Sequence, residues 1–413
     1  MTAPDVDLVV VGAGAAGLMA AVEAGRAGRP ALVLDGARRL GAKILVSGGG
    51  RCNVTHDRVD ERDYAGSSPA AIRRVLRRFD VARTIEFFAG LGVELKREDT
   101  GKLFPTTDSA HTVLDALLEA ARVSGAELRH PARVLSITAL DAEPTAFRVE
   151  TGEDRFTART VILAAGGRAL PRSGSDGAGF ELARALGHSI TPHVVPALVG
   201  LTLADGCFVR TLAGLATDVR LEVRSGTGRR LISMSGPALC THFGISGPAP
   251  MDISRHWQLA VLEDPAASLV VSWLPEATRD SLDGDLQHLG RASPARYLAG
   301  RLPARLARAL CDEAGIEGST PGHELPREAR RALVRTLLEC RLPVAGTRGW
   351  ANAEATAGGV PLSEFHLDTL ESRVVPGLFA CGELLDVDGR IGGYNFQWAW
   401  ASGHVAGTGA AAR

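Results

Sequence analysis

Residues 8–17 read Leu-Val-Val-Val-Gly-Ala-Gly-Ala-Ala-Gly, and this stretch decides the fold. The apolar run Leu8–Val11 predicts a buried parallel strand, and the alanine-rich run 18–27 predicts a helix directly behind the glycines. A second apolar run, 31–34, ends at Asp35, which stands 18 residues after the last glycine. Strand, G-x-G-x-x-G, helix, strand and acid in this order are the fingerprint of a dinucleotide-binding Rossmann-like domain.

Each glycine of this fingerprint has its own physical role. Gly12 permits the tight turn, Gly14 has no Cβ to hold a pyrophosphate away from the backbone, and Gly17 lets the helix lie close to the strand. The helix start offers N–H groups and the positive end of its dipole to the phosphates. Asp35 can accept hydrogen bonds from a ribose diol, and its charge would repel a 2′-phosphate. The fingerprint serves FAD and NAD equally, so it leaves the choice of coenzyme open.

A second glycine-rich loop follows, Lys43-Ile-Leu-Val-Ser-Gly-Gly-Gly-Arg-Cys-Asn53. Its three consecutive glycines, 48–50, expose successive N–H groups, which suit a polar and extended ligand. A cation stands at either end of the loop, at Lys43 and Arg51. The alternative is a plain surface turn that binds nothing.

The composition is that of a globular protein with balanced charge. There are 46 basic and 47 acidic residues, so no electrostatic footprint predicts a nucleic-acid or anionic membrane partner. Glycine is in excess, with 48 of 413 residues against about 7% in average proteins. Because these glycines cluster in tight runs, they indicate backbone brought close to a ligand, and we expect that ligand and the substrate to be small molecules.

The cysteines and the N-terminal residues predict a cytoplasmic location. The six cysteines are scattered without a CxxC motif or zinc spacing, so we expect reduced thiols and no metal site. Residues 1–7 carry acid and no base, unlike the start of a signal peptide. No apolar stretch reaches the length of about 18 residues that a membrane span needs.

The pattern along the chain predicts a domain that is interrupted by an insertion. Residues 1–190 read as alternating strands and helices, including one helix over 70–91 and a hairpin over 133–150. Residues 191–274 are rich in predicted strands, and 275–341 carry helical runs without strand patterning. The arginines of that helical subdomain suit a solvated surface, with a polyanion partner as the alternative. Residues 342–413 again contain glycine-rich turns and end in a helix of small residues. Because both chain ends carry such turns, we expect them to form one domain.

Five motifs in order resemble a known family. They are Gly12–Gly17, Ser47–Asn53, Thr241–Pro248, Thr356–Val360 and Cys381–Gly389, the last followed by Gly392-Gly-Tyr-Asn-Phe-Gln-Trp-Ala399. Together they resemble the HI0933-like (YhiN/BaiN-type) bacterial flavoproteins, which are NAD(P)/FAD-dependent oxidoreductases. The resemblance implies an α/β fold of the glutathione-reductase type: an FAD-binding Rossmann-like domain with an inserted β-barrel domain and a helical subdomain.

The resemblance also implies which residues bind FAD. Gly12, Gly14, Ala15, Ala16 and Gly17 would hold the pyrophosphate, with Asp35 on the adenosine ribose. Lys43, Ser47, Gly48, Gly49, Arg51, Cys52 and Asn53 would run along the pyrophosphate and the flavin. Val134 would meet the adenine edge, Ala165 and Gly166 would lie near the adenosine, and Gly382 and Glu383 would lie at the ribityl–pyrophosphate end. Gly393, Tyr394 and Asn395 would present helix-start N–H groups to the flavin C2 carbonyl.

Three side chains are candidates for catalysis, each with a structural alternative. Cys52 would place a thiol near the flavin ring, but without a CxxC motif it is no disulfide redox centre, and packing is the alternative. Tyr394 would donate a proton near the flavin, or serve by stacking alone. His242 would reach the active site from the inserted domain, or be a hydrogen-bonded structural residue.

We expect an FAD-dependent oxidoreductase that acts on a small organic substrate by hydride transfer at flavin N5. No second G-x-G-x-x-G with a strand before it and an acid after it is present, so NAD(P)H, if it is the donor, would visit the flavin transiently. The alternatives are a flavin-dependent RNA-modifying enzyme, against which the near-neutral charge argues, and a non-catalytic FAD-binding protein. The oligomeric state is not predicted.

Overall fold

The computed structural model describes residues 5–140 and 146–413 of the chain. Residues 1–4, part of the stretch that argues against a signal peptide, lie outside the described residues. The chain forms two compact units, and each is described by itself. Unit 1 comprises the residues up to Pro196 together with Glu354–Arg413, and unit 2 comprises Ala197–Ala353.

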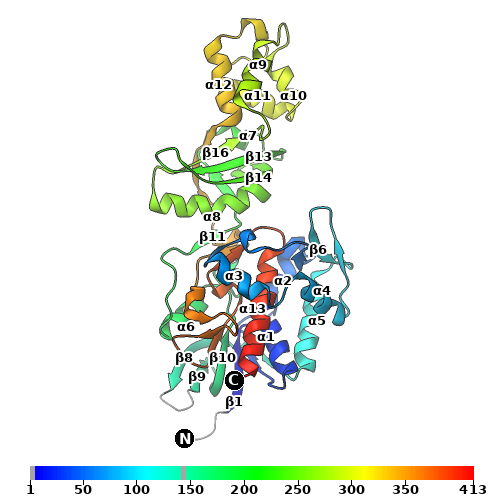
Figure 1. Ribbon diagram of the computed structural model, residues 1–413, viewed down its shortest axis with the longest axis vertical. Helices are drawn as coiled ribbons and strands as arrows, with labels where there is room; N and C mark the ends of the chain where they lie inside the picture. Colours follow the sequence, from blue (N-terminus) through cyan, green and yellow to red (C-terminus); the bar gives the residue numbers. More distant parts are fainter. Residues whose placement is uncertain (1–4, 141–145) are drawn as a thin grey trace. The chain divides into compact units, whose positions relative to one another are not determined.

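Unit 1 is built around a parallel sheet (Figure 1). Strand β1 (Val6–Val11) lies between β10 (Arg155–Leu163) and β2 (Leu32–Leu34), and it runs parallel to both. Outside these, β22 (Leu378–Ala380) pairs in parallel with β10, and β7 (Glu127–Arg129) pairs in parallel with β2. The carboxyl ends of all these strands therefore meet at one edge, where ligands bind in open α/β sheets.

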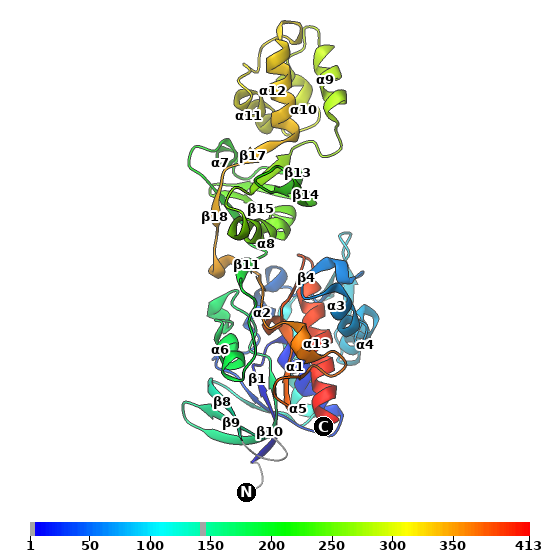
Figure 2. The same ribbon diagram turned by 60° about the vertical axis from the view of Figure 1, so that its left-hand side comes forward.

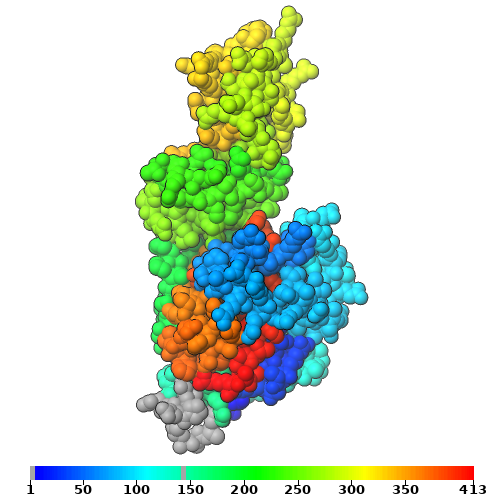
Figure 3. All heavy atoms as spheres, in the orientation of Figure 1, coloured from blue at the N-terminus to red at the C-terminus, as the bar shows by residue number. Residues whose placement is uncertain are grey.

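Two helices from opposite chain ends pack closely beside this sheet. Helix α1 (Ala15–Arg26) follows β1, and α13 (Tyr394–Ala411) ends the chain; Figure 2 shows them side by side. A Cβ built on Gly403 would lie 2.5 Å from the Ala16 carbonyl oxygen, and one on Gly407 would lie 2.4 Å from that of Ala20. The glycines of α13 therefore permit the close contact between the two helices. Figure 3 shows the N-terminal segment (blue) beside the C-terminal segment (red) on the surface of unit 1.

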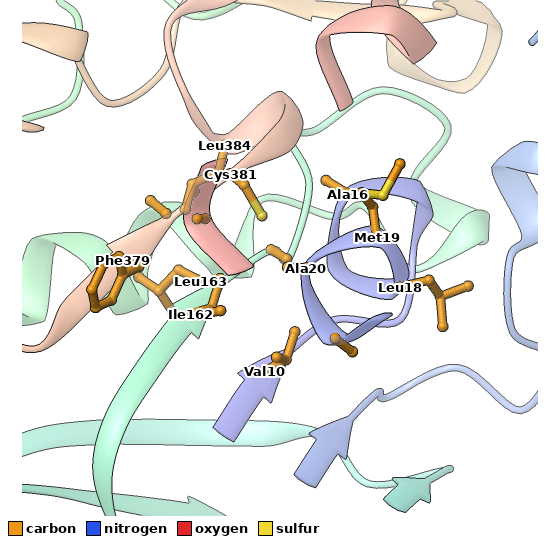
Figure 4. Close-up of a cluster of buried hydrophobic side chains, with 14 of the residues drawn as sticks. Val10, Ala16, Leu18, Met19, Ala20, Ile162, Leu163, Phe379, Cys381 and Leu384 are labelled. Atoms are coloured by element: carbon orange, nitrogen blue, oxygen red, sulfur yellow. The ribbon is translucent and has the colours of Figure 1, made fainter. Parts of the chain in front are cut away.

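The core of unit 1 lies between α1 and the strands (Figure 4). Val10 of β1, Ile162 of β10 and Phe379 of β22 are fully buried, and Met19 and Ala20 of α1 lie in the same cluster. Because β22 comes from the C-terminal segment, this core joins the two parts of the discontinuous unit.

The remaining elements of unit 1 surround this centre. They are α2 (Ala42–Val46), β3 (Thr55–His56), β4 (Tyr64–Gly66), β5 (Leu95–Arg97), β6 (Lys102–Pro105), α5 (Ala110–Val123), β8 (Val134–Leu140), β9 (Ala146–Thr151), α6 (Ala178–Ala185), β19 (Ala355–Ala357), β20 (Phe365–His366), β21 (Glu371–Ser372) and β23 (Val387–Gly389). The predicted hairpin is present, since β8 pairs antiparallel with β9.

The prediction of one helix over 70–91 is wrong. The segment forms α3 (Pro69–Leu76) and α4 (Val81–Gly90). The break lies at Asp80, whose backbone is extended and whose side chain accepts a 3.0 Å hydrogen bond from the Arg83 N–H. Asp80 thus caps the start of α4, and the chain forms two helices. The spacing of the apolar residues had suggested a single helix across this break.

Unit 2 is a seven-stranded antiparallel barrel. Its strands are β12 (Leu201–Leu203), β13 (Ala216–Arg224), β14 (Arg230–Thr241), β15 (Gly244–Ser246), β16 (Ser268–Ser272), β17 (Cys340–Leu342) and β18 (Val344–Thr347), in the order β17-β16-β13-β14-β15-β12-β18. The two ends of this order, β17 and β18, are joined by Pro343 alone. One continuous segment thus pairs with β16 through its first half and with β12 through its second half, which closes the sheet.

Helices complete unit 2. Helix α8 (Pro248–Glu263) packs against β13 and β14, and α7 (Phe208–Thr211) is a single turn. The helical subdomain contains α9 (Arg279–Gln287), α10 (Pro294–Ala299), α11 (Ala304–Glu313) and α12 (Arg327–Leu338). These four helices lie between Arg279 and Leu338.

Candidate functional site

The first glycine loop is fixed by close backbone contacts. Gly12 has a φ of 107°, and a Cβ on it would lie 2.4 Å from the Ala164 carbonyl oxygen. A Cβ on Gly17 would lie 1.9 Å from the Gly12 carbonyl oxygen. Any other residue at either position would force the loop away from β10, so these two glycines shape the turn and the strand–helix contact.

Gly14 differs, because the space beside it is open. It caps the start of α1, and a Cβ on it would meet no atom within 4 Å. The first intrahelical bond runs from Leu18 N–H to the Gly14 carbonyl, so the N–H groups of the first turn, including those of Ala15 and Ala16, have no helical partner. An open space in front of a helix start fits the pyrophosphate of a dinucleotide.

Asp35 holds the loop from the end of β2. Its Oδ2 accepts a 2.6 Å hydrogen bond from the Ala13 N–H, and its Oδ1 accepts a 2.7 Å bond from the Ala37 N–H. Each carboxylate oxygen can accept a further bond, so the ribose role remains open to this side chain. A Cβ on Gly36, the residue after Asp35, would lie 3.0 Å from the Cβ of Arg133, which precedes buried Val134 in the chain.

The loop 43–53 is partly helical, where the sequence suggested loop alone. It begins in α2 and continues as a 3-10 turn at Ser47–Gly49, with positive φ at Gly48, Gly49 and Gly50. A Cβ on Gly49 would meet nothing within 4 Å, so this turn also borders open space. The Ser47 hydroxyl donates to the Ile44 carbonyl at 2.8 Å and stabilises the turn.

Arg51 is held by protein groups. Its Nη1 donates to Glu98 at 2.6 Å, and its guanidinium carbon lies 4.0 Å from the centre of the Phe104 ring. A Cβ on Gly48 would lie 2.8 Å from that ring. Arg51 therefore fixes the loop against Phe104, and its contact with FAD stays a prediction.

Cys52 is fully buried, with a φ of 62°. Burial raises the pKa of its thiol from an ordinary value of 9.0 to about 12. A neutral, enclosed thiol is a poor nucleophile. These properties favour the packing role over the catalytic one.

Asn53 meets the start of α13. Within the part of the chain that the structure describes, its Oδ1 is buried and has no hydrogen-bond partner. A Cβ on Gly393 would lie 2.9 Å from this oxygen and 2.6 Å from the Thr55 carbonyl carbon. A buried polar atom without a protein partner fits a site that receives a polar ligand.

The residues after Gly393 are anchored by their neighbours. Tyr394 is 7% exposed; its ring stacks on His56 with centroids 5.0 Å apart, and its carbonyl accepts a 2.9 Å bond from the Tyr64 hydroxyl. The Asn395 side chain accepts from the Gly389 N–H at 2.9 Å and donates to the Gly389 carbonyl at 3.0 Å. Both ends of the Asn395 amide are thus engaged by Gly389, which orients the side chain, and the backbone N–H of Asn395 in the first turn of α13 has no helical partner.

The third glycine turn lies beside the first. Gly382 has a φ of 75°, and a Cβ on it would lie 2.8 Å from the Ala16 Cβ. Glu383 next to it pairs with Lys43, so two predicted FAD residues from distant segments are in contact. Ala165 and Gly166 follow β10 at the same sheet edge, where a Cβ on Gly166 would lie 2.9 Å from the Ser175 hydroxyl.

Sequence reasoning missed the side chains that support these turns from α13. The Trp398 Nε1–H donates to the Gly382 carbonyl at 3.1 Å, and the Ser402 hydroxyl accepts from the Gly382 N–H at 2.9 Å. The Trp400 Nε1–H donates to the Val54 carbonyl at 2.8 Å. Polar atoms within an otherwise apolar helix were the available signal.

His242 belongs to unit 2. It is exposed in the turn between β14 and β15, and its carbonyl accepts a 2.9 Å bond from Arg210 Nε. Its ring lies edge-on to Phe243. Its catalytic role stays a prediction.

The described residues contain no cluster of three or more His, Cys, Asp or Glu side chains suited to a metal ion. None of their helices combines the length and hydrophobicity that a membrane span requires.

Comparison with solved structures supports the fold. A 3-ketosteroid Δ1-dehydrogenase from Sterolibacterium denitrificans aligns with a TM-score of 0.53 at 14% identity, covering 98% of this chain and 99% of that one. At this identity the likeness concerns the fold alone. It agrees with the predicted α/β architecture.

Comparison with known sequences shows the family. The model of the HI0933-like protein Rossmann domain matches residues 6–409. The 3-dehydro-bile acid Δ(4,6)-reductase of Clostridium scindens is 38% identical over 411 residues, 98% of each chain. The ribosomal RNA dihydrouridine synthase of Escherichia coli is 33% identical over 401 residues, 96% of each chain. The predicted enzyme class is confirmed, and the chain belongs to the HI0933-like family of FAD-dependent oxidoreductases.

Proposed function

We propose that this protein uses FAD to reduce a carbon–carbon double bond that is conjugated to a carbonyl group. The names of both curated relatives describe this chemistry. A 3-oxo steroid with Δ4 and Δ6 double bonds is a conjugated dienone, and the uracil double bond that is lost in dihydrouridine is conjugated to the C4 carbonyl. A carbonyl at that position stabilises the negative charge that a hydride brings to the substrate.

The open space at the first glycine turn is the observation that carries the FAD assignment. Gly14 stands at the start of α1, where a Cβ would meet no atom within 4 Å and where the N–H groups of the first turn have no helical partner. The residues present fit the coenzyme there: an anion would neutralise the helix start, and the first turn of α1 carries no acid to oppose it.

The chain's own residues would bind and orient the coenzyme. Bound FAD, once reduced by the electron donor, would supply the hydride from its N5 atom. The N–H groups at the start of α13 would favour negative charge on the flavin ring, because the helix dipole is positive there. The Lys43–Glu383 pair would hold the ribityl–pyrophosphate end.

The electron donor is proposed to be NAD(P)H, acting without a binding domain of its own. The sequence carries one dinucleotide fingerprint, and in this proposal the coenzyme occupies it. NAD(P)H would then approach the flavin transiently and leave before the substrate binds.

The test uses the purified protein in the absence of oxygen. We expect a yellow protein whose band near 450 nm bleaches with NADH or NADPH and returns when a 3-oxo-4,6-diene steroid is added. A colourless protein that takes up no added FAD would contradict the coenzyme assignment. Bleaching without reoxidation by any enone would retain the coenzyme and contradict the substrate class.

RNA is the second candidate substrate, favoured by the name of the Escherichia coli relative. The overall charge of −1 argues against a broad RNA-binding surface. In the helical subdomain, Arg279, Arg301 and Arg330 are already paired with carboxylates. Dihydrouridine formed in unmodified ribosomal RNA, with no turnover of the steroid, would select RNA over the small enone.

A further inference from the structure

The Thr356 hydroxyl in β19 joins the loop after β10 to Glu383. Its Oγ1 donates a 2.6 Å hydrogen bond to Glu383 Oε1. The same oxygen accepts hydrogen bonds from the backbone N–H groups of Arg168 at 2.7 Å and Ala169 at 3.0 Å. Thr356 is 1% exposed, so its hydroxyl exchanges no hydrogen bonds with bulk water.

The hydrogen-bond capacity of this hydroxyl is fully used. A threonine hydroxyl carries one proton and accepts two bonds. Arg168 and Ala169 occupy both acceptor positions, which leaves the proton for Glu383. The direction of the bond is therefore fixed, and the Glu383 carboxylate always faces a donor.

Gly167 shows how tightly this arrangement is enclosed. A Cβ on Gly167 would lie 2.4 Å from Thr356 Oγ1 and 3.0 Å from Glu383 Oε1. The loop backbone thus packs directly on both polar groups. Only glycine leaves room for the pair at this position.

The second carboxylate oxygen of Glu383 is held from another direction. Glu383 Oε2 accepts a hydrogen bond from Lys43 Nζ of α2. The lysine and glutamate side chains are 24% and 19% exposed, so this pair borders an accessible space while Thr356 lies behind it. Lys43 can thus meet a ligand, whereas Thr356 can act only through Glu383.

We propose that Thr356 is a positioning residue for FAD binding, which orients Glu383 and through it Lys43. A carboxylate fixed at both oxygens keeps the lysine ammonium in one place, so an incoming polar ligand meets an ordered pair. The inference rests on the proposed FAD site and adds a residue to which neither the family motifs nor the relatives assign a role.

The test is a double-mutant cycle on FAD affinity. Apoprotein is titrated with FAD and the quenching of flavin fluorescence gives Kd for the wild type, Thr356→Val, Glu383→Ala and the double variant. We expect Thr356→Val to weaken binding about tenfold in the wild-type background and less than twofold in the Glu383→Ala background, which has no acceptor for the Thr356 hydroxyl. Thr356→Ser retains the hydroxyl and should bind FAD within about twofold of the wild type.

The outcomes separate the inference from the function on which it rests. Equal losses of affinity in both backgrounds, or a serine variant as weak as the valine variant, would overturn the positioning role, since either indicates structural damage independent of Glu383. A wild-type protein that binds no FAD would overturn the coenzyme site and this role together. If the valine variant does not fold by circular dichroism, Thr356→Ala replaces it in the same cycle.

Discussion

The Gln397 amide oxygen, in the first turn of α13, accepts a 2.7 Å hydrogen bond from the Thr55 hydroxyl of β3. The same oxygen accepts a second bond, of 2.9 Å, from the Thr84 hydroxyl of α4, and the Gln397 amide nitrogen donates to the Phe79 carbonyl at 2.9 Å. Gln397 is 1% exposed. One buried amide thus fixes the start of α13 against the segment that carries Asn53, which joins two parts of the proposed FAD site.

Replacing Gln397 with leucine should destabilise unit 1 and weaken FAD binding. The change removes the acceptor of the Thr55 hydroxyl and the donor to the Phe79 carbonyl, whereas the Thr84 hydroxyl can still donate to the Asp80 carbonyl, and we expect a loss of about 3 kcal/mol in the free energy of unfolding. The midpoint of urea unfolding, followed by tryptophan fluorescence, measures it. Gln287→Leu on the exposed surface of α9 is the matched control and should change the midpoint little. Equal midpoints for both variants would show that the buried amide contributes nothing.

Substitutions at two glycines of the fingerprint should have different effects, one on coenzyme binding and the other on the stability of the fold. Gly14→Val places its side chain in open space, so the apoprotein should melt within a few degrees of the wild type while FAD binding falls at least tenfold. Gly17→Ala places a Cβ 1.9 Å from the Gly12 carbonyl oxygen and should lower the melting temperature of the apoprotein itself. Gly152→Ala, which also meets open space, is the control. A Gly14→Val protein with unchanged FAD affinity would contradict the assignment of this turn to the pyrophosphate.

The sequence predicted those features that depend on local order. The strand, the glycine turn, the helix and Asp35 lie within 30 residues. The residue types in this short stretch were therefore enough to predict the strand–turn–helix unit. The hairpin of β8 and β9 was predictable for the same reason. The return of the chain end to the first domain was predictable because glycine-rich turns recur in the last segment.

The supporting contacts could not be predicted from one sequence. Gln397 and Thr55 are 342 residues apart, and nothing near either residue in the chain indicates its partner. Thr356 begins the motif Thr356–Val360, but the direction of its hydroxyl toward Glu383 depends on backbone groups of the loop after β10. The break before α4 was missed because the apolar period continues across Asp80, whose capping bond competes with helix continuation.

The buried Cys52 thiol should make stability depend on alkaline pH. Its pKa is raised by burial from 9.0 to about 12, so the folded protein keeps a proton that the unfolded chain releases above pH 9. The unfolded state then binds fewer protons, and the free energy of unfolding falls as pH rises from 9 toward 12. Urea midpoints at pH 8 and pH 10 measure the fall, which should be smaller in Cys52→Ala. Equal pH dependence in the two proteins would assign the effect to other buried groups whose pKa is raised, such as Tyr64, Cys240 and Cys381.

Asp35→Asn should weaken FAD binding more than FMN binding. The asparagine amide keeps one acceptor oxygen but places N–H donors against the Ala13 or Ala37 N–H, so one of the two loop bonds is lost. If Asp35 also binds the adenosine ribose, the affinity for FAD should fall about tenfold while that for FMN, which has no adenosine, changes less than twofold. Asp99→Asn in an exposed turn is the control. Equal losses for FAD and FMN would mean that Asp35 acts by holding the glycine loop, because a distorted loop weakens both ligands, and would leave the ribose without a carboxylate partner.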